Sequence, residues 1–64
     1  MQEEYYKWNG ADAGMTRARL IRGKSGFIRI KESKEYKADL DAKDGIFWDT
    51  CIYGKAITKE EYEA

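Results

Sequence analysis

The 64-residue sequence contains no histidine, no proline and only one cysteine, Cys51. A single cysteine excludes a disulfide within the chain, and an unpaired thiol is typical of a reducing compartment. Without histidine or a second thiol, the usual ligands of a zinc site are also missing. So short a chain buries only roughly 60% of its unfolded surface. We therefore expect one domain, residues 1–64, that gains its stability from good packing or from self-association.

The same absences remove the common arrangements for catalysis. Cys51 has no histidine that would activate its thiol, and Ser25 and Ser33 have no plausible base. The run Arg22-Gly23-Lys24-Ser25 resembles the end of a phosphate-binding loop, but a strand-like segment follows it where that loop needs a helix. We expect no enzymatic activity and no catalytic, cofactor or metal site.

Long apolar runs are absent as well. The longest unbroken run, Ile46–Trp48, has three residues, far fewer than the roughly 20 that a transmembrane helix needs. The first residues, Met1 to Glu4, are acidic, and no apolar stretch follows them as it would in a secretory signal peptide. We expect a cytoplasmic protein that does not contact a membrane.

The most informative feature that is present is a basic segment. All four arginines lie between positions 17 and 29, and with Lys24 and Lys31 they give residues 17–31 a charge of +6 without one acidic residue. Residues 1–16 carry −2 and residues 32–64 carry −4, so the whole chain is neutral. Clustered arginines suit an anion-binding surface, since each guanidinium offers a fork of donors. Overall neutrality argues against a general nucleic-acid coat protein.

Alternation of apolar and polar residues predicts β-strands in the first half of the chain. Residues 3–8 read as a strand, residues 9–14 as a loop, and residues 15–22 and 27–31 as a hairpin. A three-residue turn over 24–26, with glycine last, would join the hairpin. That register places Leu20 opposite Ile30 and Arg19 opposite Lys31. Even-numbered residues then form an apolar core face, and odd-numbered residues form a basic face.

The second half of the chain repeats this pattern. Residues 34–42 and 46–53 are expected to form a second hairpin around the turn 43–45. A bend or bulge near Ser33 would join this hairpin to the first. Its register places Asp39 opposite Asp49 on the face away from the core.

The end of the sequence predicts a short helical turn. Thr58 and Glu61 have the spacing of a capping box, with Ile57 and Tyr62 placed to pack back on the sheet. The fold class is therefore mainly β. We expect a small, five-stranded, strongly bent antiparallel sheet or partly open barrel, of the size of SH3 or OB domains, with a short C-terminal helical turn.

Arginines and aromatic rings share the face opposite the predicted core. Tyrosine and arginine are enriched at protein interfaces, and a contiguous aromatic patch marks a partner surface. We expect a small non-enzymatic protein-interaction module that self-associates or binds another protein, as an inhibitor or adaptor of a phage or mobile element would. Its partner-binding residues would be Arg17, Arg19, Arg29, Lys31, Phe27, Tyr5, Phe47 and Tyr53. The core face would hold Tyr6, Trp8, Leu20, Ile28, Ile30, Tyr36, Leu40, Trp48 and Ile52.

Three alternatives stay open. In the first, the basic hairpin of residues 17–31 belongs to a small nucleic-acid-binding barrel that holds phosphates with arginines and stacks bases on Phe27 or Tyr5. In the second, a nucleotide or similar small anion is held between subunits. In the third, the basic face has no ligand, because Asp39, Asp41 and Asp49 neutralise it within the chain.

Overall fold

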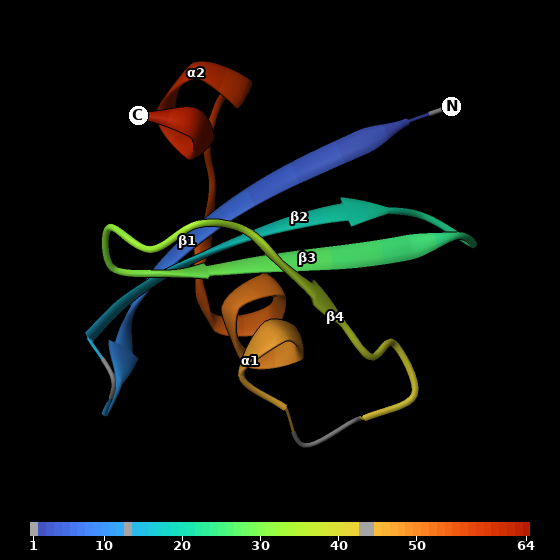
Figure 1. The fold of residues 1–64 in the computed structure, drawn as a ribbon, viewed down its shortest axis with the longest axis horizontal. Helices are drawn as coiled ribbons and strands as arrows, with labels where there is room; N and C mark the ends of the chain where they lie inside the picture. The colour runs from blue at the N-terminus through green and yellow to red at the C-terminus, as the bar shows by residue number, and fades with distance from the viewer. Residues whose placement is uncertain (1, 13, 43–44) are drawn as a thin grey trace.

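The computed structural model describes residues 2–12, 14–42 and 45–64. They form β1 Glu3–Ala11, β2 Gly14–Ile21, β3 Ser25–Ile30, β4 Tyr36–Ala38, α1 Ile46–Tyr53, β5 Lys55–Ala56 and α2 Lys59–Glu63. The five strands make one open antiparallel sheet in the order β4-β3-β2-β1-β5 (Figure 1). The predicted fold class is confirmed, as a mainly β chain with a short C-terminal helix. Ala13 of the predicted loop and Lys43 and Asp44 of the predicted turn lie outside the described residues.

The first hairpin, β1–β2, takes up most of the segment that we expected to be a loop. Glu3 lies opposite Ile21 and Trp8 opposite Thr16, and a register shift follows between Trp8 and Ala11. Such a bulge increases the local twist and lets a hairpin extend past an irregular segment. The polar and small residues after Trp8 therefore belong to β1 rather than to a free loop.

The β2–β3 hairpin has the predicted faces but not the predicted register. Its turn is three residues, 22–24, instead of 24–26, and Arg19 lies opposite Phe27 rather than Lys31. Gly23 adopts the positive φ of 74° that this turn requires. Gly26 serves a different purpose within β3, because a Cβ there would lie 2.5 Å from Cζ of Phe47. Both turns contain an odd number of residues, so odd-numbered residues still share one face.

The chain reverses in a turn between β3 and β4, and the bend or bulge that we expected near Ser33 is wrong. Lys31 has a positive φ of 55°. The Ser33 backbone N–H donates to the carbonyl of Ile30 at 3.0 Å, and the Ser33 hydroxyl accepts from the Ile30 N–H at 3.1 Å. Serine side chains close turns in this way. The chain then returns as β4, antiparallel to β3, with Lys37 opposite Phe27.

The strand expected over residues 46–53 is also wrong, because this segment is helix α1 between Gly45 and Gly54. Aromatic and β-branched residues favour strands. Apolar residues stand at most positions here, however, so their spacing fits either structure. Phe47 and Thr50 are buried on the same side of the helix. We attribute the helix to the packing of that side on the sheet, which outweighs the local preference for a strand.

Helix α1 covers the core face, where Phe47 joins Ala18, Leu20 and Ile28 in the buried cluster. Partly buried residues surround this cluster: Tyr6, Ile30, Ala38, Leu40, Ile46, Trp48 and Cys51. Two residues that we assigned to the core are exposed instead, Tyr36 by 51% and Ile52 by 65%. The helix turns Ile52 away from the sheet, which explains the second error.

Two buried threonines join α1 to β2. The hydroxyl oxygens of Thr16 and Thr50 lie 2.6 Å apart, and both residues are fully buried. Each hydroxyl also faces a backbone carbonyl, that of Ile46 at 2.8 Å from Thr50 and that of Trp8 at 3.3 Å from Thr16, and either hydroxyl can donate to the other. Each buried hydroxyl thus has the partner that it needs.

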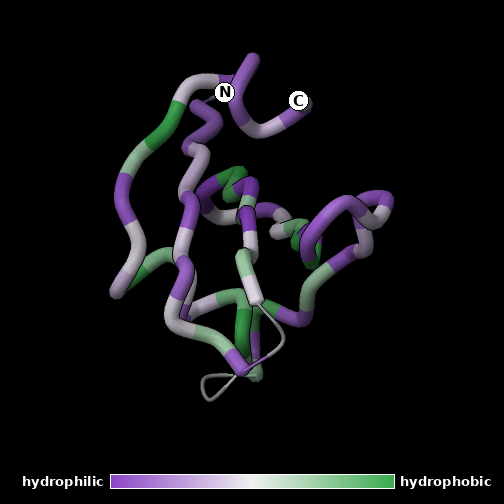
Figure 2. The backbone as a smooth tube through the Cα atoms, turned by 90° about the vertical axis from the view of Figure 1, so that its left-hand side faces the viewer, coloured by the Kyte–Doolittle hydropathy of each residue, from purple (hydrophilic) through white to green (hydrophobic). Residues whose placement is uncertain are grey.

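Helix α2 lies on the opposite, basic face of the sheet (Figure 1). The predicted capping box is confirmed: the Thr58 hydroxyl accepts from the Glu61 N–H at 3.1 Å, and Glu61 Oε1 accepts from the Thr58 N–H at 3.2 Å. The segment is mainly hydrophilic (Figure 2), and its one buried residue is Tyr62. The sheet therefore carries one helix on each face. Neither helix is long and apolar enough to cross a membrane, as judged over the described residues.

Candidate interaction surfaces

The strand registers arrange the basic face in rows. Lys55 lies opposite Lys7, Lys7 opposite Arg17, and Arg17 opposite Arg29, so that one row carries four cations across β5, β1, β2 and β3. We call these four residues the cation row. The neighbouring row contains Tyr5, Arg19, Phe27 and Lys37. The basic segment of the sequence is thus joined on this face by lysines from both ends of the chain.

Arg17 and Arg29 hold the C-terminal end of α2. Arg17 is only 4% exposed, and its Nη1 donates to the carbonyls of Glu61, Tyr62 and Ala64 at 3.1, 3.2 and 2.6 Å. Arg29 Nη1 donates to the same Tyr62 carbonyl at 2.5 Å. The last carbonyls of a helix have no partner within it, and cations are favourable there. These two predicted binding residues are therefore engaged by the chain itself.

Arg19 is engaged as well, although more openly. Its guanidinium lies over the ring of Phe27, 4.5 Å from the ring centroid. It also lies 3.4 Å from a carboxylate oxygen of Glu3 and 3.6 Å from one of Glu35. Arg19 and Phe27 remain partly exposed beside Lys37, because α2 covers the other end of this face. This is the uncovered part of the Arg/aromatic face that we predicted.

Arg22 does not belong to the basic face. It lies in the β2–β3 turn and binds the carboxylate of Glu4, which also accepts from the Tyr6 hydroxyl. The hydrogen bond from Arg22 is the main cause that lowers the pKa of Glu4. Since the Arg22 side chain is 67% exposed, this pair adds little to stability.

The remaining predicted binding residues lie in four different places. Tyr5 is half-buried on the basic face, with its ring centroid 5.4 Å from that of Tyr62. Lys31 is exposed in the turn after β3. The expectation that Phe47 faces a partner is wrong: it is 3% exposed in the core, because α1 replaces the strand that would have turned it outward. Tyr53 is 68% exposed at the end of α1.

Tyr53 belongs to an apolar surface whose other members we had assigned to the core. Its ring centroid lies 5.9 Å from that of Trp8, and its neighbour Ile52 is 65% exposed. We call Trp8, Ile52 and Tyr53 the α1 surface. The glycines at positions 45 and 54, which bound an eight-residue segment, were the available signal for a helix that would expose these residues.

The aspartates that we considered as internal partners do not neutralise the arginines. In the described ranges the ion pairs of the arginines are with Glu3, Glu4 and Glu35, not with Asp39, Asp41 or Asp49. Asp39 accepts instead from the backbone N–H of Asp41 at 2.9 Å. The third alternative is therefore wrong about the neutralising residues, because glutamates rather than these aspartates pair with Arg19 and Arg22.

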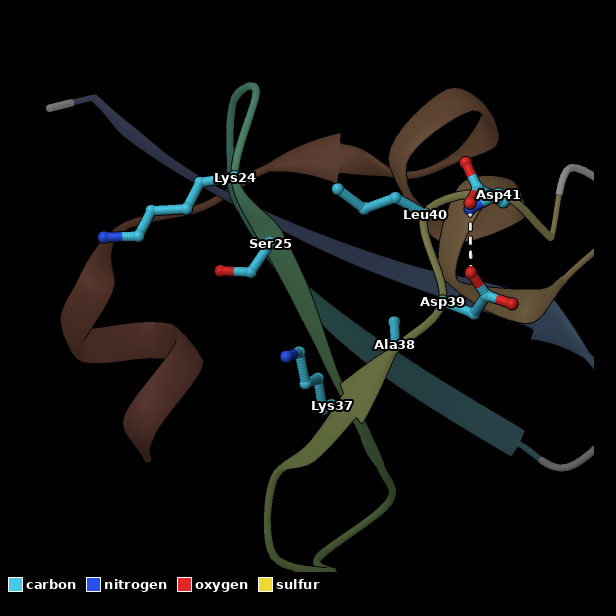
Figure 3. A pocket seen from close by; sticks show the side chains of 7 residues that line it. All are labelled: Lys24, Ser25, Lys37, Ala38, Asp39, Leu40 and Asp41. Carbon is cyan, nitrogen blue, oxygen red and sulfur yellow. Dashed lines mark hydrogen bonds between the residues drawn. The ribbon is translucent and has the colours of Figure 1, made fainter.

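An open cavity of about 520 Å³ lies where the chain leaves β4. Its lining residues are Lys24, Ser25, Lys37, Ala38, Asp39, Leu40 and Asp41. In Figure 3 the lysines and the serine lie on one side and the two aspartates on the other. Because both signs of charge line it, the cavity does not favour a ligand of one charge.

Cys51 is half-buried on α1, and burial raises the pKa of its thiol to about 11. A thiol with so high a pKa is a poor nucleophile at neutral pH. No group of three or more histidine, cysteine or carboxylate side chains that would hold a metal ion occurs among residues 2–12, 14–42 and 45–64.

Comparison with known proteins gives no relative of this chain. No family model, curated protein or solved structure matches it. The function must therefore be argued from the geometry of its own surfaces.

Proposed function

We propose that this chain is a non-enzymatic protein-interaction module, and that it self-associates through the α1 surface. The observation that carries the proposal is the exposure of the consecutive residues Ile52 and Tyr53, 65% and 68%, with the ring of Tyr53 beside that of Trp8. Contiguous exposed apolar residues mark protein interfaces, and tyrosine and tryptophan are the residues that most often anchor them.

The arginines of the basic face support this choice of surface. Arg17 and Arg29 donate to backbone carbonyls around α2, and Arg19 contacts two carboxylates. Groups that already have partners contribute less to binding, because those partners must first be given up. Among the residues that the structure describes, the exposed side chains of the α1 surface make no comparable polar contacts, so this surface gains most from burial.

A second copy of the chain is the partner that best fits the α1 surface. An apolar patch is complementary to itself across a two-fold axis, which is the geometry of most homodimers. A domain of 64 residues also has a thin stability margin, and association is a common way to increase it.

Sedimentation velocity over a concentration series tests this proposal. We expect the wild-type chain to form dimers at micromolar concentration and the Ile52→Ser/Tyr53→Ser variant to stay monomeric. Tyr36→Ser is the matched control, since Tyr36 is also an exposed aromatic residue, 51% exposed, but lies on β4. A wild-type chain that is monomeric at every concentration, or a dimer that Tyr36→Ser disrupts, would count against the proposal.

A further inference from the structure

The cation row is electrostatically unusual. Lys55, Lys7, Arg17 and Arg29 occupy directly opposite positions on four adjacent strands. Like charges in such positions repel and destabilise a sheet unless something offsets them. Within the described residues the arginines of this row have no aspartate or glutamate side chain within ion-pair distance. The row is therefore expected to have a partner of opposite polarity.

In the structure that partner is α2. Its carbonyl oxygens accept hydrogen bonds from Arg17 and Arg29, and the ring of Tyr62 lies 5.9 Å from the Arg29 guanidinium and 5.4 Å from the ring of Tyr5. Residues 58–64 also carry three glutamates against one lysine, a charge of −2. An acidic segment thus presents oxygen acceptors to a row of cations, together with one aromatic ring that is tilted by 50° against the ring of Tyr5.

The attachment of α2 depends on one buried side chain and on polar contacts: Arg17 and Arg29 donate to its carbonyls, and the Tyr62 hydroxyl donates to Glu35 at 2.6 Å. The helix has five residues, and Tyr62 is its only buried side chain. So short a helix is not stable by itself, and its capping box supplies much of its local order. Segments with little buried apolar surface open more often than the rest of a fold.

We propose that α2 is a displaceable cover over a binding site for single-stranded nucleic acid, formed by the cation row and Tyr5. Three gaps between four strands span about 14 Å, the length of about four stacked nucleotides at ~3.4 Å each. The oxygens of α2 stand where phosphate oxygens would bind, and the Tyr62 ring stands where a base would stack on Tyr5. Arg17 Nε, buried and without an acceptor among the described residues, supplies one further donor.

The aromatic residues favour nucleic acid over an acidic peptide. Tyr5 lies in the row next to the cations, and Phe27 lies two strands away in the same row as Tyr5. Cations interleaved with aromatic rings on a sheet face are the usual features of proteins that bind single strands, because bases stack on the rings. An acidic peptide would need the cations alone.

The cover has a measurable consequence for affinity. If the site is open only in a minor population, the apparent dissociation constant is the intrinsic one divided by the open fraction. Loosening α2 without changing the cation row should therefore tighten binding. Thr58→Ala removes the hydroxyl cap of α2, which accepts from the Glu61 N–H, and should increase the open fraction about fivefold.

The test is fluorescence anisotropy of a short labelled oligothymidylate at low salt. We expect the wild-type chain to bind weakly, Thr58→Ala about fivefold more tightly, and Tyr62→Ser more tightly still. In the Thr58→Ala background, Lys7→Gln and Lys55→Gln should each weaken binding, and affinity should fall steeply as salt rises. Lys24→Gln and Lys34→Gln are matched controls, because they remove the same charge outside the cation row, and they should have little effect.

Circular dichroism of each variant shows whether the sheet is retained. If Tyr62→Ser unfolds the chain, Thr58→Ala still provides the test, because Thr58 lies outside the sheet. Equal affinity of wild-type and Thr58→Ala chains would overturn the proposal. So would equal losses from the four lysine substitutions, or tighter binding of polyglutamate than of the oligonucleotide. Because the α1 surface lies on the other side of the sheet, none of these results depends on whether the chain self-associates.

Discussion

The guanidinium of Arg17 donates to the backbone carbonyl of Tyr62 at 3.2 Å, although the two residues lie 45 positions apart in the chain. This contact shows that the basic segment of residues 17–31 makes contacts within the fold. Arg17 lies in the middle of the cation row, is buried beneath α2, and donates to the carbonyls of Glu61, Tyr62 and Ala64. Much of the positive charge that is conspicuous in the sequence therefore stabilises the fold.

Replacing Arg17 with glutamine should destabilise the chain by about 3 kcal/mol, since three carbonyls at the end of the chain, of which that of Tyr62 is buried, would lose a charged donor at once. Urea denaturation followed by tryptophan fluorescence measures this change. Arg22→Gln is the matched control and should cost far less, because its ion pair with Glu4 is exposed. Similar losses in the two variants would show that Arg17 does not hold α2.

The buried Thr16–Thr50 pair should behave as one unit in a double-mutant cycle. Thr50→Val leaves the Thr16 hydroxyl with only the distant Trp8 carbonyl at 3.3 Å, and each single valine variant should cost about 1–2 kcal/mol. The double variant should cost less than the sum of the two, because both polar groups are then gone. Strictly additive free energies of unfolding would contradict the hydroxyl contact of 2.6 Å.

Gly26→Ala should destabilise the fold by about 1–3 kcal/mol through overpacking. A Cβ at this position would meet Cζ of Phe47 at 2.5 Å and Cδ2 of Leu40 at 2.9 Å. Adding Phe47→Leu should recover part of the loss, because the smaller side chain leaves room for the methyl group. The midpoint of thermal unfolding measures the loss. If Gly26→Ala leaves this midpoint unchanged, α1 does not pack on β3 as described.

Cys51 should react slowly in the folded chain. Burial raises the pKa of its thiol from 9.0 to about 11, so at pH 8 the reactive thiolate should be about 100-fold scarcer than in the unfolded chain. The folded state holds this proton more tightly, and stability should therefore decline as pH rises from 9 toward 11. Alkylation rates with and without urea give the comparison, and equal rates would contradict the burial of Cys51.

The faces of the β2–β3 hairpin were predictable, while its register was not. The turns 22–24 and 24–26 each contain a glycine, and both place odd-numbered residues opposite odd-numbered ones. The alternation of apolar and polar residues therefore cannot distinguish the two registers. The choice depends on Phe47, which needs Gly26 beneath its ring. That contact joins residues 21 positions apart and has no local signal.

The helix α1 and the covered basic face are two further features that could not be predicted from the sequence. Residues 46–53 consist of strand-favouring types, and only their packing on the sheet makes them helical. Arg17 donates to backbone carbonyls. Because every residue carries a backbone carbonyl, the sequence does not indicate which residues Arg17 contacts. The capping box of α2 was predictable because its two side chains are specific and lie three residues apart.

The claim that the α1 surface is the partner surface is tested most directly by nuclear magnetic resonance of the labelled chain over a dilution series. We predict that the backbone signals of Trp8, Ile52 and Tyr53 shift with concentration, while those of Phe27 and Lys37 on the uncovered basic face stay constant. Shifts confined to the basic face, or spectra that do not change with concentration, would contradict this account.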